Sequence, residues 1–350
     1  MTVADDGFLS TFERTGRSLR ARASDALDPL RSVRNRAVVA LDERLSARAK
    51  AGLWVAVVLV LFAVPLVTEN EFYIDVLIRM FQLAVLAQSF NIIAGYAGLF
   101  SLGHVAFYGL GAYSAVLLTN AGVDPVLTLL AGGVVAVAVS VPVGVISITA
   151  TGIYFALVTL ALAEMFRIFF LEQWEVGSLM TIGGSSGEFI RIGWSDGLFY
   201  WVFLMLLVAV VLTTYHLKRS MLGLNFEMIR EDETLAQSFG IDVRKYKLVA
   251  FVISAFFPGV VGSAFAMYSG FIIPGSVFSV NISVGMQVQA ILGGLGTVFG
   301  PILGAFVLLT LEETFATFSN VKNLLYGFLM IVLMLYLPGG LLSLLKRSDR

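Results

Sequence analysis

The chain has 350 residues, of which 58% are hydrophobic and only 13% are charged, and its mean hydropathy is +0.89. Soluble domains carry about 25% charged residues, so this composition excludes water-soluble enzymes and nucleic-acid-binding proteins and indicates an integral membrane protein. The formal net charge of −1 gives no reason to expect a nucleic-acid partner, and the absence of cysteine excludes disulfides, thiolate catalysis and cysteine metal sites.

An N-terminal extension of 50 residues precedes the apolar part of the chain. A secretory signal has an apolar core soon after a basic start, whereas the first apolar run here begins only at Ala51. Val38, Leu41 and Leu45 fall on one helical face. We expect residues 1–50 to form a cytoplasmic amphipathic extension, which either lies at the bilayer surface as a helix or partly disordered tail, or docks on a cytosolic partner.

Residues 51–345 form the predicted transmembrane permease domain, because long apolar runs alternate there with short polar connections. A membrane-crossing helix needs about 20 residues, and runs that are apolar on every face favour helices over barrel strands. We predict an all-α, polytopic helix bundle with about ten spans (8–10). These cover 51–67, 76–97, 100–119, 125–148, 152–171, 197–217, 247–268, 279–297, 299–317 and 322–342.

The least certain boundaries lie in 248–311, where three spans require two tight reversals. Pro274 and the glycine-rich run 293–301 supply the necessary helix breakers. One of these segments is alternatively a re-entrant half-helix.

The distribution of basic residues predicts the orientation in the cell membrane. Nineteen of the 23 Lys and Arg residues lie in 1–50, 218–247 and the tail after residue 345 (346–350). Cytoplasmic segments are enriched in Lys and Arg, so we expect all three segments, and both termini, to be cytoplasmic. Termini on the same side require an even number of spans, which agrees with ten and not with nine.

The segment 218–247 is the largest predicted cytoplasmic connection. Ser220 or Asn225 is suited to cap one short helix, and Gly240 to end another in the left-handed conformation. Such a helix cannot bury its apolar side alone, so it packs either on its own membrane domain or on a soluble partner. Its apolar residues recur at helical spacing among charges: Leu224, Met228, Leu235 and Phe239.

Two pairs of opposite charges lie in or near predicted spans. Asp75 and Arg79 are four positions apart at an outer end, and we interpret them as a self-neutralised pair near the interface. Glu164 and Arg167 are three positions apart within a span. They are interpreted in the same way, with a role in the translocation path or its gating as the alternative.

Five blocks of sequence, in order along the chain, resemble the membrane permeases of branched-chain amino acid ABC importers (the LivH/LivM family), and most of all the M-type subunit. Residues 91–113 read NIIAGYAGLFSLGHVAFYGLGAY and closely resemble the family signature. The segments 151–161, 181–187 and 229–241 resemble further blocks of the M-type permease, and 293–301 resembles GGLGTxxGP.

The resemblance implies a subunit that moves branched-chain or other hydrophobic amino acids inward; relatives carry urea, amides and other small solutes. It implies as partners a second, H-type permease, two ATPase subunits, an extracytoplasmic substrate-binding protein and the lipid bilayer. No GxxxxGK[ST] phosphate-binding motif occurs, so we expect no cofactor, metal or catalytic site in this chain, with ATP bound by its partners. The resemblance further implies a coupling helix whose acidic residues meet basic groups of the ATPase. Its residues are Gly223, Arg230, Glu231, Asp232, Glu233, Ala236 and Gly240.

Glycines and polar residues of the signature indicate an unwound backbone between Gly95 and Gly103, which would offer amides and carbonyls to an amino acid. For His104 a structural hydrogen bond is the favoured interpretation. Gly296, Gly300 and Gly304 form a ladder of small residues for helix packing. The candidate path comprises Asn91, Gly95, Tyr96, Gly98, Ser101, Gly103, His104, Tyr154, Thr159, Glu164 and Arg167.

Two other classes of function remain as alternatives. A stand-alone secondary transporter or channel would need an ion site made of membrane carboxylates, and Glu164 alone qualifies. A membrane-embedded enzyme would need a catalytic cluster, and neither HExxH nor a paired-acid motif is present.

Overall fold

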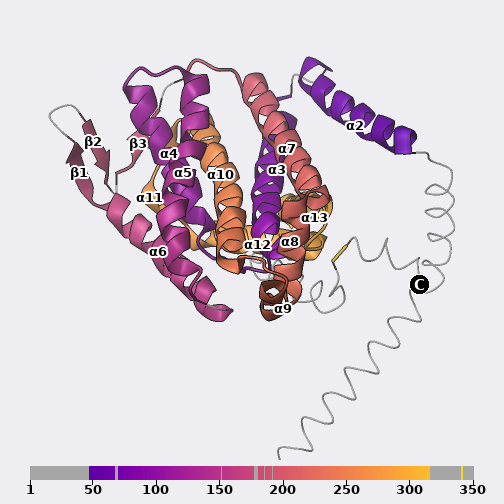
Figure 1. The fold of residues 1–350 in the computed structure, drawn as a ribbon. Helices are drawn as coiled ribbons and strands as arrows, with labels where there is room; N and C mark the ends of the chain where they lie inside the picture. The colour runs from indigo at the N-terminus through magenta and orange to yellow at the C-terminus, as the bar shows by residue number, and fades with distance from the viewer. Residues whose placement is uncertain are drawn as a thin grey trace, which may run out of the picture.

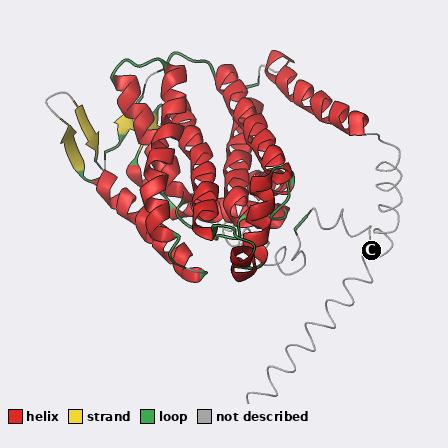
Figure 2. Ribbon diagram, viewed as in Figure 1, coloured by secondary structure: helices red, strands yellow, loops and turns green. Residues whose placement is uncertain are grey.

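The computed structural model of the chain is a bundle of helices, with short strands confined to one edge (Figures 1 and 2). The predicted all-α class is therefore confirmed. The predictions for residues 1–46, for the span 322–342 apart from residues 340 and 341, and for the tail 346–350 lie outside the described residues. The structure describes residues 47–67, 70–150, 152–176, 180–184, 186–190, 192–315 and 340–341.

The helices occur in the order α2 (Ala47–Val67), α3 (Glu71–Asn91), the π-helix η1 (Ile92–Tyr96), α4 (His104–Asn120), α5 (Pro125–Ser147), α6 (Ile153–Leu171), α7 (Asp196–Arg219), α8 (Met221–Glu231), α9 (Glu233–Ser238), α10 (Val243–Ser269), α11 (Pro274–Val277), α12 (Val280–Gly293) and α13 (Gly300–Phe315). The strands are β1 (Gln173–Val176), β2 (Met180–Gly183), β3 (Glu188–Phe189) and β4 (Phe271–Ile272).

Each predicted span from 51–67 to 299–317 coincides with one of these helices. The exact number of membrane crossings stays a prediction, because α4 and α13 have only 17 and 16 residues. Within the described residues, six segments are long and apolar enough to cross a bilayer: Glu71–Tyr96, Pro125–Ser147, Ile153–Leu171, Asp196–Arg219, Val243–Ser269 and Pro274–Gly293.

Local sequence explains where several of these helices begin. The side chain of Asn70 accepts a hydrogen bond from the Phe72 amide (3.0 Å) and so caps α3. Asp124 accepts one from the Val126 amide (2.8 Å), and Pro125 fits the first position of α5, where no amide donor is needed.

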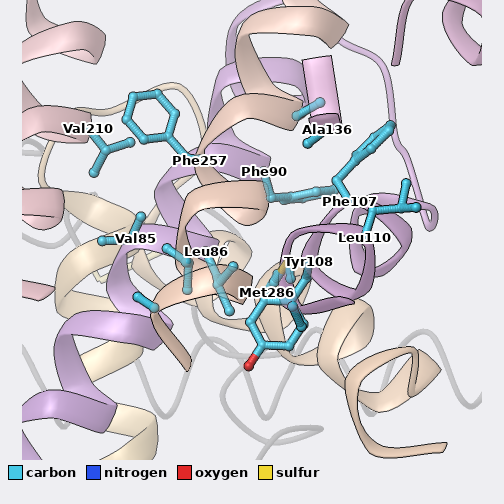
Figure 3. Close-up of a cluster of buried hydrophobic side chains, with 14 of the residues drawn as sticks. Val85, Leu86, Phe90, Phe107, Tyr108, Leu110, Ala136, Val210, Phe257 and Met286 are labelled. Atoms are coloured by element: carbon cyan, nitrogen blue, oxygen red, sulfur yellow. The ribbon is translucent and has the colours of Figure 1, made fainter. Parts of the chain in front are cut away.

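The core is centred on α10, which packs against α3, α4 and α5. Glycines bring these backbones into contact: a Cβ atom on Gly111 would overlap Gly259 of α10, and one on Gly262 would overlap the Tyr108 carbonyl of α4. Small residues have this role in membranes because lipid provides no hydrophobic drive for helix association. Figure 3 shows the adjoining apolar cluster, with Phe107 of α4 and Phe257 of α10 among its members.

The connections between long helices lie at two opposite ends of the bundle. At one end, β3 pairs with β4 in antiparallel register, and the Tyr268 hydroxyl donates to Asp75 (2.7 Å). Asp75 also pairs with Arg79 at 3.0 Å, as the spacing predicted. Helices α8 and α9 lie at the other end, at the bottom of Figure 1. This alternation agrees with the order of the predicted inner and outer connections.

Two peripheral elements complete the described part. Helix α2 contacts α7 through Tyr200, whose hydroxyl donates to the Leu61 carbonyl (2.7 Å), and through stacking of Phe62 on Trp201. Strands β1 and β2 form an antiparallel hairpin after α6, with Trp174 opposite Ile182.

Candidate coupling and translocation site

The segment between α7 and α10 folds into the two short helices α8 and α9. Ser220 caps α8 by accepting a hydrogen bond from the Gly223 amide (3.3 Å), which confirms one of its two predicted caps. Asn225 is not a cap, because it lies inside α8. Gly223 packs so closely on α7 that a Cβ atom would overlap the Leu217 carbonyl. Gly240 follows α9 with a φ of +82°, as predicted for a residue that ends a helix.

One side of α8 and α9 packs on the chain's own membrane domain. Ile229, Ala236 and Val243 form a buried cluster, and Phe226 is fully buried beside Tyr246. The same two helices also carry large apolar residues that are at least half exposed in the described part of the chain. These are Met221 (78% exposed), Leu224 (51%), Leu235 (55%) and Phe239 (68%).

The acidic residues of the segment make contacts within the chain. Glu231 accepts from Arg230 (2.9 Å), although its side chain is 74% exposed. Asp232 caps α9 by accepting from the amides of Thr234 and Leu235, at 2.8 and 3.0 Å. Glu233 pairs at 2.5 Å with Lys247, whose side chain is only 3% exposed. A buried ammonium requires such a partner.

Between α3 and α4 the chain leaves the α-helical conformation, where the sequence predicted an unwound backbone. The π-helix η1 is followed by a non-helical stretch, residues 97–103, that includes Gly98 with a φ of +73°. Irregular backbone at membrane depth must be surrounded by protein or line a polar cavity. Here the Leu102 amide donates to Thr159 of α6 (3.1 Å), and Gln287 of α12 donates to the Ser101 carbonyl (3.3 Å).

His104 starts α4 and is fully buried. Its Nδ1 lies 3.1 Å from the Ser101 hydroxyl, and its Nε2 lies 3.0 Å from the Ser254 hydroxyl of α10. The ring therefore fastens the non-helical stretch to α10, which confirms a structural hydrogen-bonding role. Gly103 fits against α6 so closely that a Cβ atom would lie 2.7 Å from the Thr159 carbonyl oxygen.

Asn91, the last residue of α3, joins this region to the reversal between α12 and α13. Its side-chain Nδ2 donates to the Thr297 backbone carbonyl (2.8 Å), and its side-chain Oδ1 accepts from the Gly296 backbone amide (2.7 Å). Gly95 faces the same turn, since a Cβ atom on it would lie 2.5 Å from the Gly296 nitrogen. Two buried groups nearby on α3 and η1, the side-chain amide of Gln88 and the hydroxyl of Tyr96, have no hydrogen-bond partner in the described part of the chain.

The predicted glycine ladder is only partly a helix-packing feature. Gly304 lies within α13 and faces the Gln289 carbonyl of α12, and Gly300, the first residue of α13, meets Gly293. Gly296 lies in the turn between the helices with a φ of +74°. Its placement on a packed helix face is therefore wrong, because the turn requires a conformation that favours glycine.

The remaining path candidates lie on α6, where only Thr159 reaches the non-helical stretch. Tyr154 is 65% exposed. The guanidinium of Arg167 donates through Nε to both carboxylate oxygens of Glu164, at 2.8 Å each, and both side chains are partly exposed. The predicted pairing is confirmed, and the pair is not in contact with the break.

Three residues that hold predicted site residues are not among the sequence-predicted candidates. Gln287, Ser254 and Lys247 each hold a predicted site residue. The available signal was a polar side chain in an otherwise apolar helix, which is costly unless it has a partner.

Comparisons with known proteins give a consistent result. A family described as branched-chain amino acid transport system / permease component matches residues 72–336. The chain is 33% identical to the high-affinity branched-chain amino acid transport system permease protein LivM of Escherichia coli over 294 residues, which cover 75% of this chain and 68% of the relative. It is 23% identical to LivH of Salmonella typhimurium, over 74% of this chain and 91% of the relative. No solved structure matches.

Proposed function

The chain belongs to the branched-chain amino acid permease family, and we propose from this premise that it is the LivM-type membrane subunit of an ABC importer for branched-chain or other hydrophobic amino acids. The observation that carries the proposal is the family match over 72–336, which includes both the break after α3 and the α8–α9 segment. The alternative substrates within the same mechanism are urea, amides and other small solutes.

We propose that the working complex also contains an H-type permease, two ATPase subunits and an external substrate-binding protein. The chain itself then acts as a transport subunit and not as an enzyme, and ATP is bound by its partners. Both termini and the α8–α9 segment face the cytoplasm in this arrangement. Its support is the excess of Lys and Arg in 1–50, 218–247 and 346–350.

The ATPase docks, in this proposal, on the exposed apolar side of α8 and α9. Apolar side chains at the centre of an interface contribute most of the binding energy, and Phe239 and Leu235 are exposed here. Asp232 caps α9 and Glu233 pairs with the buried Lys247, whereas Glu231 pairs only with its neighbour Arg230 in the described part of the chain and is 74% exposed, so Glu231 is the acidic residue best placed to meet a basic group of the ATPase.

Coupling then has a simple physical form. Closure of the ATPases around ATP moves the docking groove, and the groove carries α8 and α9 with it. Because one side of these helices packs on α7 and α10, their displacement shifts the bundle between inward-open and outward-open states.

The test is reconstitution of the chain with its partner subunits in proteoliposomes that contain ATP, followed by measurement of leucine, isoleucine and valine uptake. Uptake that requires ATP supports the proposal. Uptake driven by an ion gradient without ATP would instead indicate a secondary transporter. If urea or amides are taken up and the three amino acids are not, the substrate belongs to the class of small solutes instead.

A pair of matched variants tests the docking surface. Phe239→Asp puts a carboxylate into the proposed apolar contact and should reduce copurification of the ATPases by about tenfold or more. Phe189→Asp changes an equally exposed phenylalanine (70% against 68%) at the opposite end of the bundle and should leave copurification unchanged. Equal effects of the two variants would contradict the proposed docking side.

A further inference from the structure

The side chain of Arg230, on α8, reaches out of its own helix into the membrane domain. Its Nη1 donates to the carbonyl of Gly95 in η1, at 2.5 Å and across 135 positions of sequence. Its Nη2 donates to the neighbouring Glu231 at 2.9 Å. The carbonyls at the end of a helix carry partial negative charge, so a guanidinium is well suited to this position.

Two glycines leave room for this side chain. A Cβ atom on Gly98 would lie 2.8 Å from Cγ of Arg230, and one on Gly296 would lie 3.0 Å from its Nη1. Gly98 and Gly296 both have positive φ angles, +73° and +74°. Arg230 therefore lies between two turns: the break that follows α3 and the reversal between α12 and α13.

These two turns are also fastened to each other. The Asn91 side chain bonds both the Gly296 amide and the Thr297 carbonyl, and Gly95 lies against Gly296. A displacement of α8 consequently acts on both turns at once, through a charge-assisted hydrogen bond at one point and through close contact at the others.

We propose that Arg230 is a positioning residue that transmits the movement of α8 to the break after α3 and to the α12–α13 turn, rather than a contact residue for the ATPase. This inference rests on the proposed function, because it requires that α8 is moved by a partner. It assigns to the guanidinium the step between the docking surface and the non-helical stretch, residues 97–103, that His104 and Thr159 hold in place.

The first experiment measures substrate taken up per ATP hydrolysed in the reconstituted complex. Arg230→Met removes the donors and should lower this ratio by about tenfold, while ATPase copurification and ATP hydrolysis stay near those of the unchanged chain. Arg230→Lys keeps the charge and one donor and should restore the ratio to within about threefold. Arg244→Met, at an exposed arginine at the start of α10 that has no ion pair with any described residue, is the matched control and should have no effect.

The second measurement does not depend on a variant that removes the guanidinium. Because the chain has no cysteine, spin labels can be attached at Leu222→Cys on α8, outside the residues named as the docking surface, and at Leu295→Cys in the turn, both exposed. Their separation should stay constant within about 2 Å between ATP-bound and ATP-free states if the two segments move together. A clear change in this separation would overturn the inference.

The other outcomes are also decisive. An uptake ratio for Arg230→Met equal to that of the unchanged chain refutes the positioning role, and loss of ATPase copurification in that variant assigns Arg230 to the partner interface instead. Absence of ATP-driven uptake by the unchanged complex counts against the proposed function itself, whereas the label separation still reports on the junction.

Discussion

Replacement of Asn91 by alanine tests whether the junction between α3 and the α12–α13 turn stabilises the fold. The change removes two hydrogen bonds, at 2.7 and 2.8 Å, made by a fully buried side chain. Hydrogen bonds between membrane helices contribute about 0.6 kcal/mol each on average. The amide of Gly296 and the carbonyl of Thr297 also lose their partner, at about 1 kcal/mol each, the low end of the range, because both residues are only partly buried.

The sum is a loss of about 3 kcal/mol, from which the better helix propensity of alanine recovers about 0.5 kcal/mol. The expected decrease in the free energy of unfolding is therefore about 2–3 kcal/mol. It should be measured by titration of mixed detergent micelles with a denaturing detergent, with tryptophan fluorescence as the signal.

The matched control is Asn281→Ala, at an exposed asparagine of α12, which should change the free energy of unfolding by less than about 0.5 kcal/mol. An Asn91→Ala variant as stable as the control would refute the reasoning, because it would show that the turn is held without the side-chain amide.

Three further predictions concern other parts of the fold. Glu233→Gln should destabilise the chain by about 1–3 kcal/mol, because it leaves the buried Lys247 unpaired, and the double variant with Lys247→Met should recover much of that loss in the same assay. Gly304→Ala should cost about 1–3 kcal/mol, since its Cβ atom would push α13 away from the Gln289 carbonyl of α12. Burial raises the pKa of the Glu188 carboxyl. The protonated carboxyl therefore favours the folded state in acid, and this stabilisation is lost as the pH rises through the folded-state pKa. Glu188→Gln cannot ionise, so its melting temperature relative to that of the unchanged chain should be higher at neutral pH than in acid.

The sequence was sufficient to predict the described helices and the ends of the short helices in the segment 218–247. Long apolar runs locate α5 and α7, because lipid requires about 20 apolar residues whatever their neighbours. The cap at Ser220 and the helix end at Gly240 are local in sequence and were predicted for the same reason.

Contacts over long sequence separations could not be predicted from these patterns. The motif that contains Arg230 and the motif that contains Gly95 were both recognised, but nothing in either one shows that they touch across 135 positions. Gly296 was misplaced for a related reason: a spacing of four between glycines is the same whether the first lies on a helix or in a turn, and only the φ of +74° distinguishes the two.

The same bonds that satisfy the irregular backbone also join it to several helices. Residues 97–103 need partners for their peptide groups, and two of these partners come from other helices: Thr159 of α6 accepts from the Leu102 amide, and Gln287 of α12 donates to the Ser101 carbonyl. The His104 ring adds a link between the side chains of Ser101 and Ser254 of α10. A transition between two states cannot leave these groups unpaired, because each unpaired group in hydrocarbon costs several kcal/mol. The break must therefore move with its partners as a unit or exchange one set of bonds for another. In the proposed mechanism, a push by Arg230 on the Gly95 carbonyl reaches the helices that hold the break in both cases.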